Sequence, residues 1–139
     1  MQNIIVVLIL SLLFGCRESV ENKLVGHWRL DGTYDHEIYT KNKHKDLLVF
    51  LDNENYTLNW MHDDVGNTFR GKYFILNNPK RALKTLCLVP NIQDSIRIAY
   101  EINDIHKLSK DSLILISETK FIHKEGNTNI YTTKYVYVR

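Results

Sequence analysis

The chain has 139 residues, of which 18 are Lys or Arg and 16 are Asp or Glu, so its net charge is +2 when the histidines are neutral. A chain of this length builds one ordinary domain around one hydrophobic core. The near balance of charges argues against nucleic acid as a partner, because nucleic-acid-binding domains carry a strong basic excess on one face.

An apolar run of eleven residues begins at Ile4, near the N-terminus. It is too short to span a bilayer and has the length of the hydrophobic region of a secretory signal. The run leads into Leu13-Phe14-Gly15-Cys16, which resembles the lipobox of bacterial lipoproteins. The resemblance implies a signal peptide over residues 1–15 and lipid on the sulfur and the amino group of Cys16. A cleaved signal without lipid, which would leave Cys16 as a free thiol, is the alternative.

The resemblance also implies a place in the cell. Several acyl chains on one residue make attachment to a membrane stable, so we expect a lipid-anchored protein of the cell envelope. Residue 17 is Arg and not the Asp that retains such lipoproteins in the inner membrane, so outer-membrane sorting is expected. Residues 16–23 are then a lipidated tether, and residues 24–139 form the domain.

Apolar and polar residues alternate with a period of two along this domain, and Asn, Asp and Gly clusters separate the alternating segments. In the clearest segment, from Ile96 to Ile102, the isoleucines and Tyr100 share one face and Glu101 takes the other. Closing such a sheet on itself removes its two exposed edges. We predict an all-β fold, a single eight-stranded up-and-down antiparallel barrel. Its strands are predicted near 24–31, 46–52, 55–62, 68–76, 83–89, 96–103, 112–123 and 129–138.

Several short motifs resemble lipocalin-like domains. Gly26-His27-Trp28 resembles the Gly-x-Trp opening of their first strand, and Gly71-Lys72-Tyr73 resembles the G-x-Y of their fourth strand. The segment from Ile105 to Leu115 is similar to a stretch of small bacterial lipoproteins of this type. The resemblance implies a lipocalin-like barrel in which a basic residue of the last strand, here Arg139, packs over Trp28. Gly26, Trp28 and Arg139 are therefore expected to be structural.

The interior of an eight-stranded barrel is either filled by side chains or holds one small ligand. The residues expected to point inward are bulky, which favours a filled interior. Four of them, Tyr56, Trp60, Tyr73 and Tyr100, combine an apolar ring with a polar tip, which is typical of a ligand site. The full inward set is Phe50, Tyr56, Leu58, Trp60, Tyr73, Ile75, Leu86, Leu88, Ile98, Tyr100, Leu113 and Leu115.

The longest predicted connection runs from Gly32 to Lys45 and contains Tyr34 and Tyr39. Connections longer than about twelve residues often act as lids or binding loops. The sequence predicts either such a loop at the mouth of the barrel, with both tyrosines as candidate ligand contacts, or a loop without a role.

Catalytic residues, metal ligands and cofactors are not predicted. The six histidines show no close ligand spacing, and no G-x-S-x-G elbow is present. Cys87 lies in an apolar strand without a basic neighbour that would favour its thiolate, so we expect it to behave as a small buried hydrophobe. The sequence therefore favours a protein that is not an enzyme.

Two functions stay open. The first is a membrane-anchored lipocalin-like lipoprotein that binds a small apolar or amphipathic ligand. The second is a protein-interaction module with a filled barrel, which presents outer-face residues to a partner in the cell envelope. Those residues would be Phe74, Leu76, Ile114, Ile116, Val136 and Val138.

Overall fold

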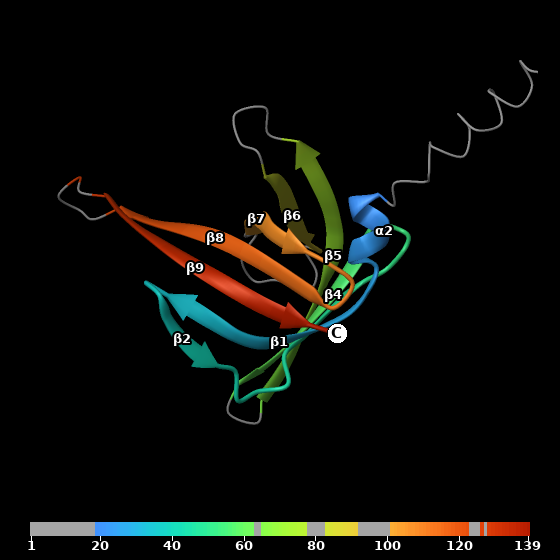
Figure 1. The fold of residues 1–139 in the computed structure, drawn as a ribbon, viewed down its shortest axis with the longest axis horizontal. Coiled ribbons are helices and arrows are strands. Elements are labelled where there is room, and N and C mark those ends of the chain that lie inside the picture. The colour runs from blue at the N-terminus through green and yellow to red at the C-terminus, as the bar shows by residue number, and fades with distance from the viewer. Residues whose placement is uncertain (1–18, 63–64, 78–82, 92–100, 123–125, 127) are drawn as a thin grey trace, which may run out of the picture.

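The computed structural model describes residues 19–62, 65–77, 83–91, 101–122, 126 and 128–139. One short helix precedes a set of antiparallel strands that wrap around a common interior (Figure 1). No helix in these ranges is long and apolar enough to cross a membrane. The elements are α2 (Val20–Leu24), β1 (Gly26–Asp35), β2 (Ile38–Lys41), β3 (Leu47–Phe50), β4 (Asn55–His62), β5 (Val65–Asn77), β6 (Lys84–Pro90), β7 (Glu101–Leu108), β8 (Ser112–Ile122) and β9 (Thr128–Val138).

The strands form a closed barrel. They hydrogen-bond in the order β2-β1-β3-β4-β5-β6-β7-β8-β9, and β1 also pairs with β9. This last pairing joins the two ends of an eight-stranded ring, while β2 is a short extra strand beside β1. The predicted all-β, eight-stranded antiparallel barrel is therefore confirmed.

The prediction of an unstructured connection from Gly32 to Lys45 is wrong. Strand β1 continues to Asp35, and a two-residue turn at His36 and Glu37 leads into β2. Both turn residues have positive φ, 46° and 76°, as a type I′ hairpin turn requires. Asn-Gly is the usual sequence signal for this turn. His36-Glu37 does not match it, so the sequence did not predict the hairpin.

Strand β7 extends further along the chain than predicted, and its faces are reversed. The prediction ended this strand at residue 103, but β7 continues to Leu108 past a register shift between Ile105 and Lys107. Glu101, expected on the outer face, pairs with the inward-facing Leu88. Ile102, expected inside, is 60% exposed. Residues 96–100 lie outside the described ranges.

The side chain of Asp46 hydrogen-bonds to β4 beyond the point where β3 begins. The buried carboxylate accepts a hydrogen bond from the backbone N–H of Met61 at 2.6 Å and another from Nδ2 of Asn42 at 3.1 Å. Met61 lies beyond the part of β4 that pairs with β3. The carboxylate therefore satisfies a backbone donor that the sheet leaves unpaired.

One end of the barrel is closed by α2 and by the last residue of the chain. The buried Trp28 donates from Nε1 to the carbonyl of Leu24 at 2.7 Å, and the Arg139 guanidinium lies 4.4 Å from the centroid of its ring. Arg139 also donates to the carbonyls of Lys23 and Val25, at 2.7 and 2.9 Å. Gly26 has a φ of 134°, which a residue with a side chain rarely adopts. The Arg139 guanidinium thus packs over Trp28, as the resemblance implies.

Candidate functional site

The half of the barrel next to α2 is filled with side chains. Tyr73 belongs to this packed half: its ring meets Phe50 edge to face at 4.8 Å, and its hydroxyl donates to the carbonyl of Leu51 at 3.0 Å. A ligand could reach this tyrosine only by displacing the core. The buried apolar residues are Leu24, Trp28, Leu30, Leu48, Phe50, Tyr56, Tyr73, Leu86, Leu88, Ile105, Leu113, Leu115 and Tyr137.

The other half of the barrel, which we call the upper half, is more open. Leu58 and Phe69 face each other across β4 and β5, and both are only half-buried. Thr133 and Tyr135 of β9 are half-buried on the same inner wall. Trp60 is 40% exposed towards the end of β4. The described inward-facing residues of the upper half are therefore less buried than those of the lower half, and Leu58 and Tyr135 pack against the core.

Glu101 lies on the inner face of the barrel, at the border between the packed half and the upper half. Its pairing with Leu88, which is 3% exposed, places it on the inner face, and the next inward residue, Asn103, is buried. Glu101 is an exposed residue, and partial burial of its carboxyl raises the pKa of that group. A carboxylate at this position is accessible to a ligand and partly shielded from water.

The negative charge of the Glu101 carboxylate affects the pKa of three tyrosines. Burial raises the pKa of Tyr56 to about 12, and the negative charge of Glu101 contributes to that rise. Burial and the same charge raise the pKa of Tyr135 and of Tyr137. Tyr56 lies on β4 and the other two on β9, so the influence of Glu101 extends across the lumen from β7.

The predicted ligand contacts do not form one cluster. Tyr56 faces the lumen and is 4% exposed, Trp60 stands near the mouth, and Tyr73 is part of the core. Tyr34 and Tyr39 are cross-strand partners outside the barrel wall, and Tyr100 lies outside the described residues. Sequence reasoning missed Glu101, Tyr135 and Tyr137. The two tyrosines could have been found, because they share one face of the predicted strand 129–138.

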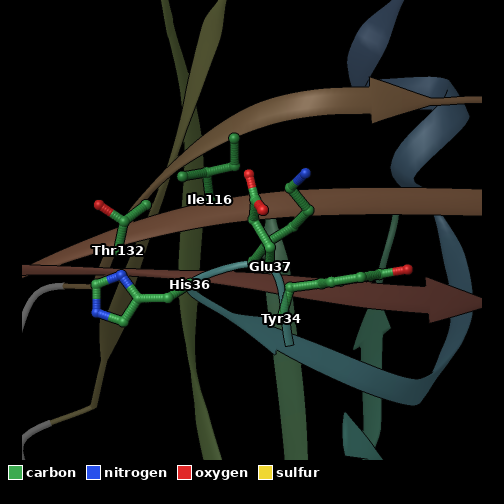
Figure 2. Close-up of a pocket in the computed structure, with 6 residues that line it drawn as sticks. Tyr34, His36, Glu37, Ile116 and Thr132 are labelled. Atoms are coloured by element: carbon green, nitrogen blue, oxygen red, sulfur yellow. The ribbon is translucent and has the colours of Figure 1, made fainter. Parts of the chain in front are cut away.

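A hollow lies on the outside of the barrel, and Figure 2 shows residues that line it. It measures about 340 Å³ and is bounded by the turn between β1 and β2 and by outer-face residues of β8 and β9. Lys134 pairs with Tyr34 in the sheet, and its Nζ lies 5.6 Å from the centroid of the Tyr34 ring. The residues that line the hollow are Tyr34, His36, Glu37, Ile116, Thr132 and Lys134.

Tyr39 packs against the neighbouring surface. Its hydroxyl donates to the Asp31 carboxylate at 2.7 Å, and its ring lies 5.0 Å from that of Tyr34. A Cβ at Gly32 would come within 2.5 Å of the Tyr39 ring, so only glycine fits beneath it. Both tyrosines predicted as loop contacts are therefore held against the outer wall.

The structure describes the surroundings of the thiol of Cys87. Cys87 is half-buried on the outer face, between the inward-facing Leu86 and Leu88, and burial raises the pKa of its thiol. A raised pKa keeps the thiol protonated and weakly nucleophilic. Among the residues that the structure describes, no three His, Cys, Asp or Glu side chains gather into a group that could hold a metal ion.

Solved structures of bacterial proteins share this barrel. One is described as a lipocalin-like protein from Bacteroides uniformis; it aligns with a TM-score of 0.58 and 16% identity, over 84% of this chain and 98% of that one. The fold is lipocalin-like. An uncharacterized protein from Bacteroides eggerthii aligns over the same shares of both chains, with a TM-score of 0.55 and 15% identity. No family model matches the sequence, and no curated protein matches it.

Glu101 in this lipocalin-like barrel should make stability depend on pH. A carboxyl whose pKa is higher in the folded chain than in the unfolded chain costs stability once the pH rises through the folded value. Glu101→Gln should therefore raise the melting temperature at pH 7.5, and the gain should vanish near about pH 3, where the carboxyl is protonated in both states. Because solvent reaches Glu101, the gain should stay under about 5 °C. Thermal melts of both proteins at the two pH values measure it, and a lower melting temperature of the variant at pH 7.5 would contradict this account.

Proposed function

We propose that this protein is a lipid-anchored, lipocalin-like binding protein that takes up one small apolar or amphipathic molecule in the upper half of its barrel. One observation carries the proposal: inward-facing residues are buried in the lower half and only partly covered in the upper half. Binding sites for small molecules are concave, mainly apolar and equipped with a few polar groups. Leu58, Phe69 and Tyr135 supply the apolar wall, and Glu101 supplies a polar group.

The open end also presents apolar side chains to solvent. Ile38 at the start of β2 is 71% exposed, and Val65 at the start of β5 is 63% exposed. Trp60 lies next to this end on β4. Exposed apolar groups around a partly open interior suit a ligand with a hydrocarbon part, because the ligand would cover them on binding.

A bulky residue on the inner wall tests the proposed site. Thr133→Trp should fill the upper half and weaken binding of a neutral amphiphile, decanol, by at least about tenfold, because the ligand and the indole would compete for one volume. Thr132→Trp is the matched control, since Thr132 lies one residue away, on the outer face. Titration calorimetry measures both variants. Equal affinity of Thr133→Trp and wild type would refute an interior site, and loss of binding only in Thr132→Trp would assign decanol to the outer hollow.

The proposed anchor would sit at the closed end of the barrel. Cys16 precedes Val20, the first residue of α2, by four positions, which is at most roughly 14 Å of extended chain. Strand β1 alone, with its ten residues, is roughly 33 Å long and leads from the closed end towards the mouth. Under this proposal the mouth opens away from the anchoring membrane, so ligand would be exchanged with the envelope space or with another component in it.

Membrane attachment through Cys16 has a direct test. Cys16→Ser should move the protein from the membrane fraction to the soluble fraction, because the lipid would have no attachment site. The melting temperature of the released barrel should equal that of the domain prepared without residues 1–16. Fractionation followed by immunoblotting measures the distribution. A Ser variant that stays in the membrane fraction at the wild-type level would rule out anchoring by this cysteine.

The interaction module is the second candidate, and one surface favours it. Phe74, Cys87 and Ile102 stand in register across the outer faces of β5, β6 and β7. Phe74 is 44% exposed and Ile102 is 60% exposed, and Leu76, two residues after Phe74, is 53% exposed. A row of this kind would be covered in a complex. The residues predicted on β8 and β9, by contrast, are half-buried: Ile114, Ile116, Val136 and Val138.

A further inference from the structure

Resting on the proposed function, we infer that the barrel selects organic cations, namely amphiphiles with a protonated amine, which Glu101 would bind through its carboxylate. The inference concerns the ligand class of the interior and not the existence of the site. At the beginning of β7, Glu101 points inward and the neighbouring Ile102 points outward, the reverse of the predicted arrangement.

This reversal runs against the usual placement of side chains. A carboxylate inside a barrel loses part of its hydration, whereas Ile102 on the outer face leaves an apolar side chain in water. Departures of this kind from the expected pattern are concentrated at functional sites. If β7 presented its opposite face to the interior here, Ile102 would be covered and Glu101 would be hydrated. The carboxylate on the inner wall therefore needs a functional explanation.

The charges of the upper half define the ligand. Among the inward-facing strand residues whose side chains the structure describes, this half contains Glu101 and, near the mouth, Asp35, but no lysine or arginine. In the same residues, no cation lies within ion-pair distance of the Glu101 carboxylate. A fatty acid would bring a second negative charge next to Glu101, whereas an ammonium group would form a charge-assisted hydrogen bond with it.

The surrounding side chains suit the rest of such a ligand. Tyr56, Tyr135 and Tyr137 lie near enough to Glu101 for its charge to raise their pKa, and cations are attracted to the faces of aromatic rings. Leu58 and Phe69 provide an apolar wall between this cluster and the mouth. An alkylamine could therefore place its head at Glu101 and its chain along that wall.

Three probes with the same chain length separate the possibilities: decylamine, decanol and decanoate, each used below its micelle concentration. Calorimetry at pH 7.5 should show decylamine binding at least about tenfold more tightly than decanol, the difference expected for one hydrogen bond to a charged group. Decanoate should bind more weakly than decanol. Glu101→Gln should remove the advantage of decylamine over decanol.

Glu37→Gln is the matched control, because it removes the same charge from the outer hollow. This variant should keep the preference for decylamine. If decanol binds but decylamine has no advantage, or if the advantage survives Glu101→Gln or is lost in Glu37→Gln, the inference is wrong while the proposed function stands. If none of the three probes binds, the proposed function itself fails.

Discussion

Trp28→Ala should lower the melting temperature by well over 10 °C. The indole is fully buried at the closed end. Its Nε1 donates a hydrogen bond to the carbonyl of Leu24, and the Arg139 guanidinium packs on its face. Replacing a buried tryptophan by alanine costs about 3–5 kcal/mol, and each kcal/mol corresponds to about 4–8 °C in a domain of this order. Calorimetric melts of the chain from residue 17 onward measure the change.

Trp60→Ala is the control for this substitution. It removes the same side chain from a site that is 40% exposed, where less apolar surface is returned to water. We expect the melting temperature of this variant to fall by less than half as much as that of Trp28→Ala. Equal effects of the two substitutions would show that the closed end is not organised around Trp28.

Gly71→Ala should be the second most destabilising of the changes considered. Gly71 faces Pro90 across β5 and β6, and a Cβ on it would overlap the carbonyl oxygen of Val89 and crowd the Pro90 backbone. Because backbone atoms cannot turn aside as a side chain can, the two strands would have to separate. We expect a loss of at least about 2 kcal/mol and a fall of about 10 °C or more in calorimetric melts.

Gly66→Ala provides the matched comparison on the same strand. There a Cβ would come within 2.9 Å of the sulfur of Met61, the flexible end of a side chain that is 36% exposed. That sulfur can move at little cost, so the melting temperature should change by no more than a few degrees. If Gly66→Ala were as harmful as Gly71→Ala, the close approach of β6 to Gly71 could not be the cause.

The barrel could be predicted from the sequence because most strands are regular. Alternation with a period of two put Phe50, Tyr56 and Leu113 inside, and all three are buried. The Gly-x-Trp resemblance indicated the end that α2 and Arg139 close. These features depend on local sequence pattern, which is visible without coordinates.

The remaining features depend on conformations and contacts that the pattern does not encode. Strand β2 was missed because His36 and Glu37 adopt positive φ without a glycine or an asparagine. Glu101 was assigned to the wrong face because its polarity predicted an outward position, whereas its pairing with Leu88 places it inside. The inward position of Tyr56 was thus predicted, and that of Glu101 was not.

The most direct test of an interior ligand site is to measure how close a bound probe comes to Trp60. Bromine quenches tryptophan fluorescence only at short range, and Trp60 stands beside the open half while Trp28 is enclosed at the other end. Titration with 10-bromodecanol should give saturable quenching in the wild type, and Trp60→Phe should abolish it although Trp28 is still present. Absence of saturable quenching, or quenching that persists undiminished in Trp60→Phe, would contradict a ligand site in the upper half of the barrel.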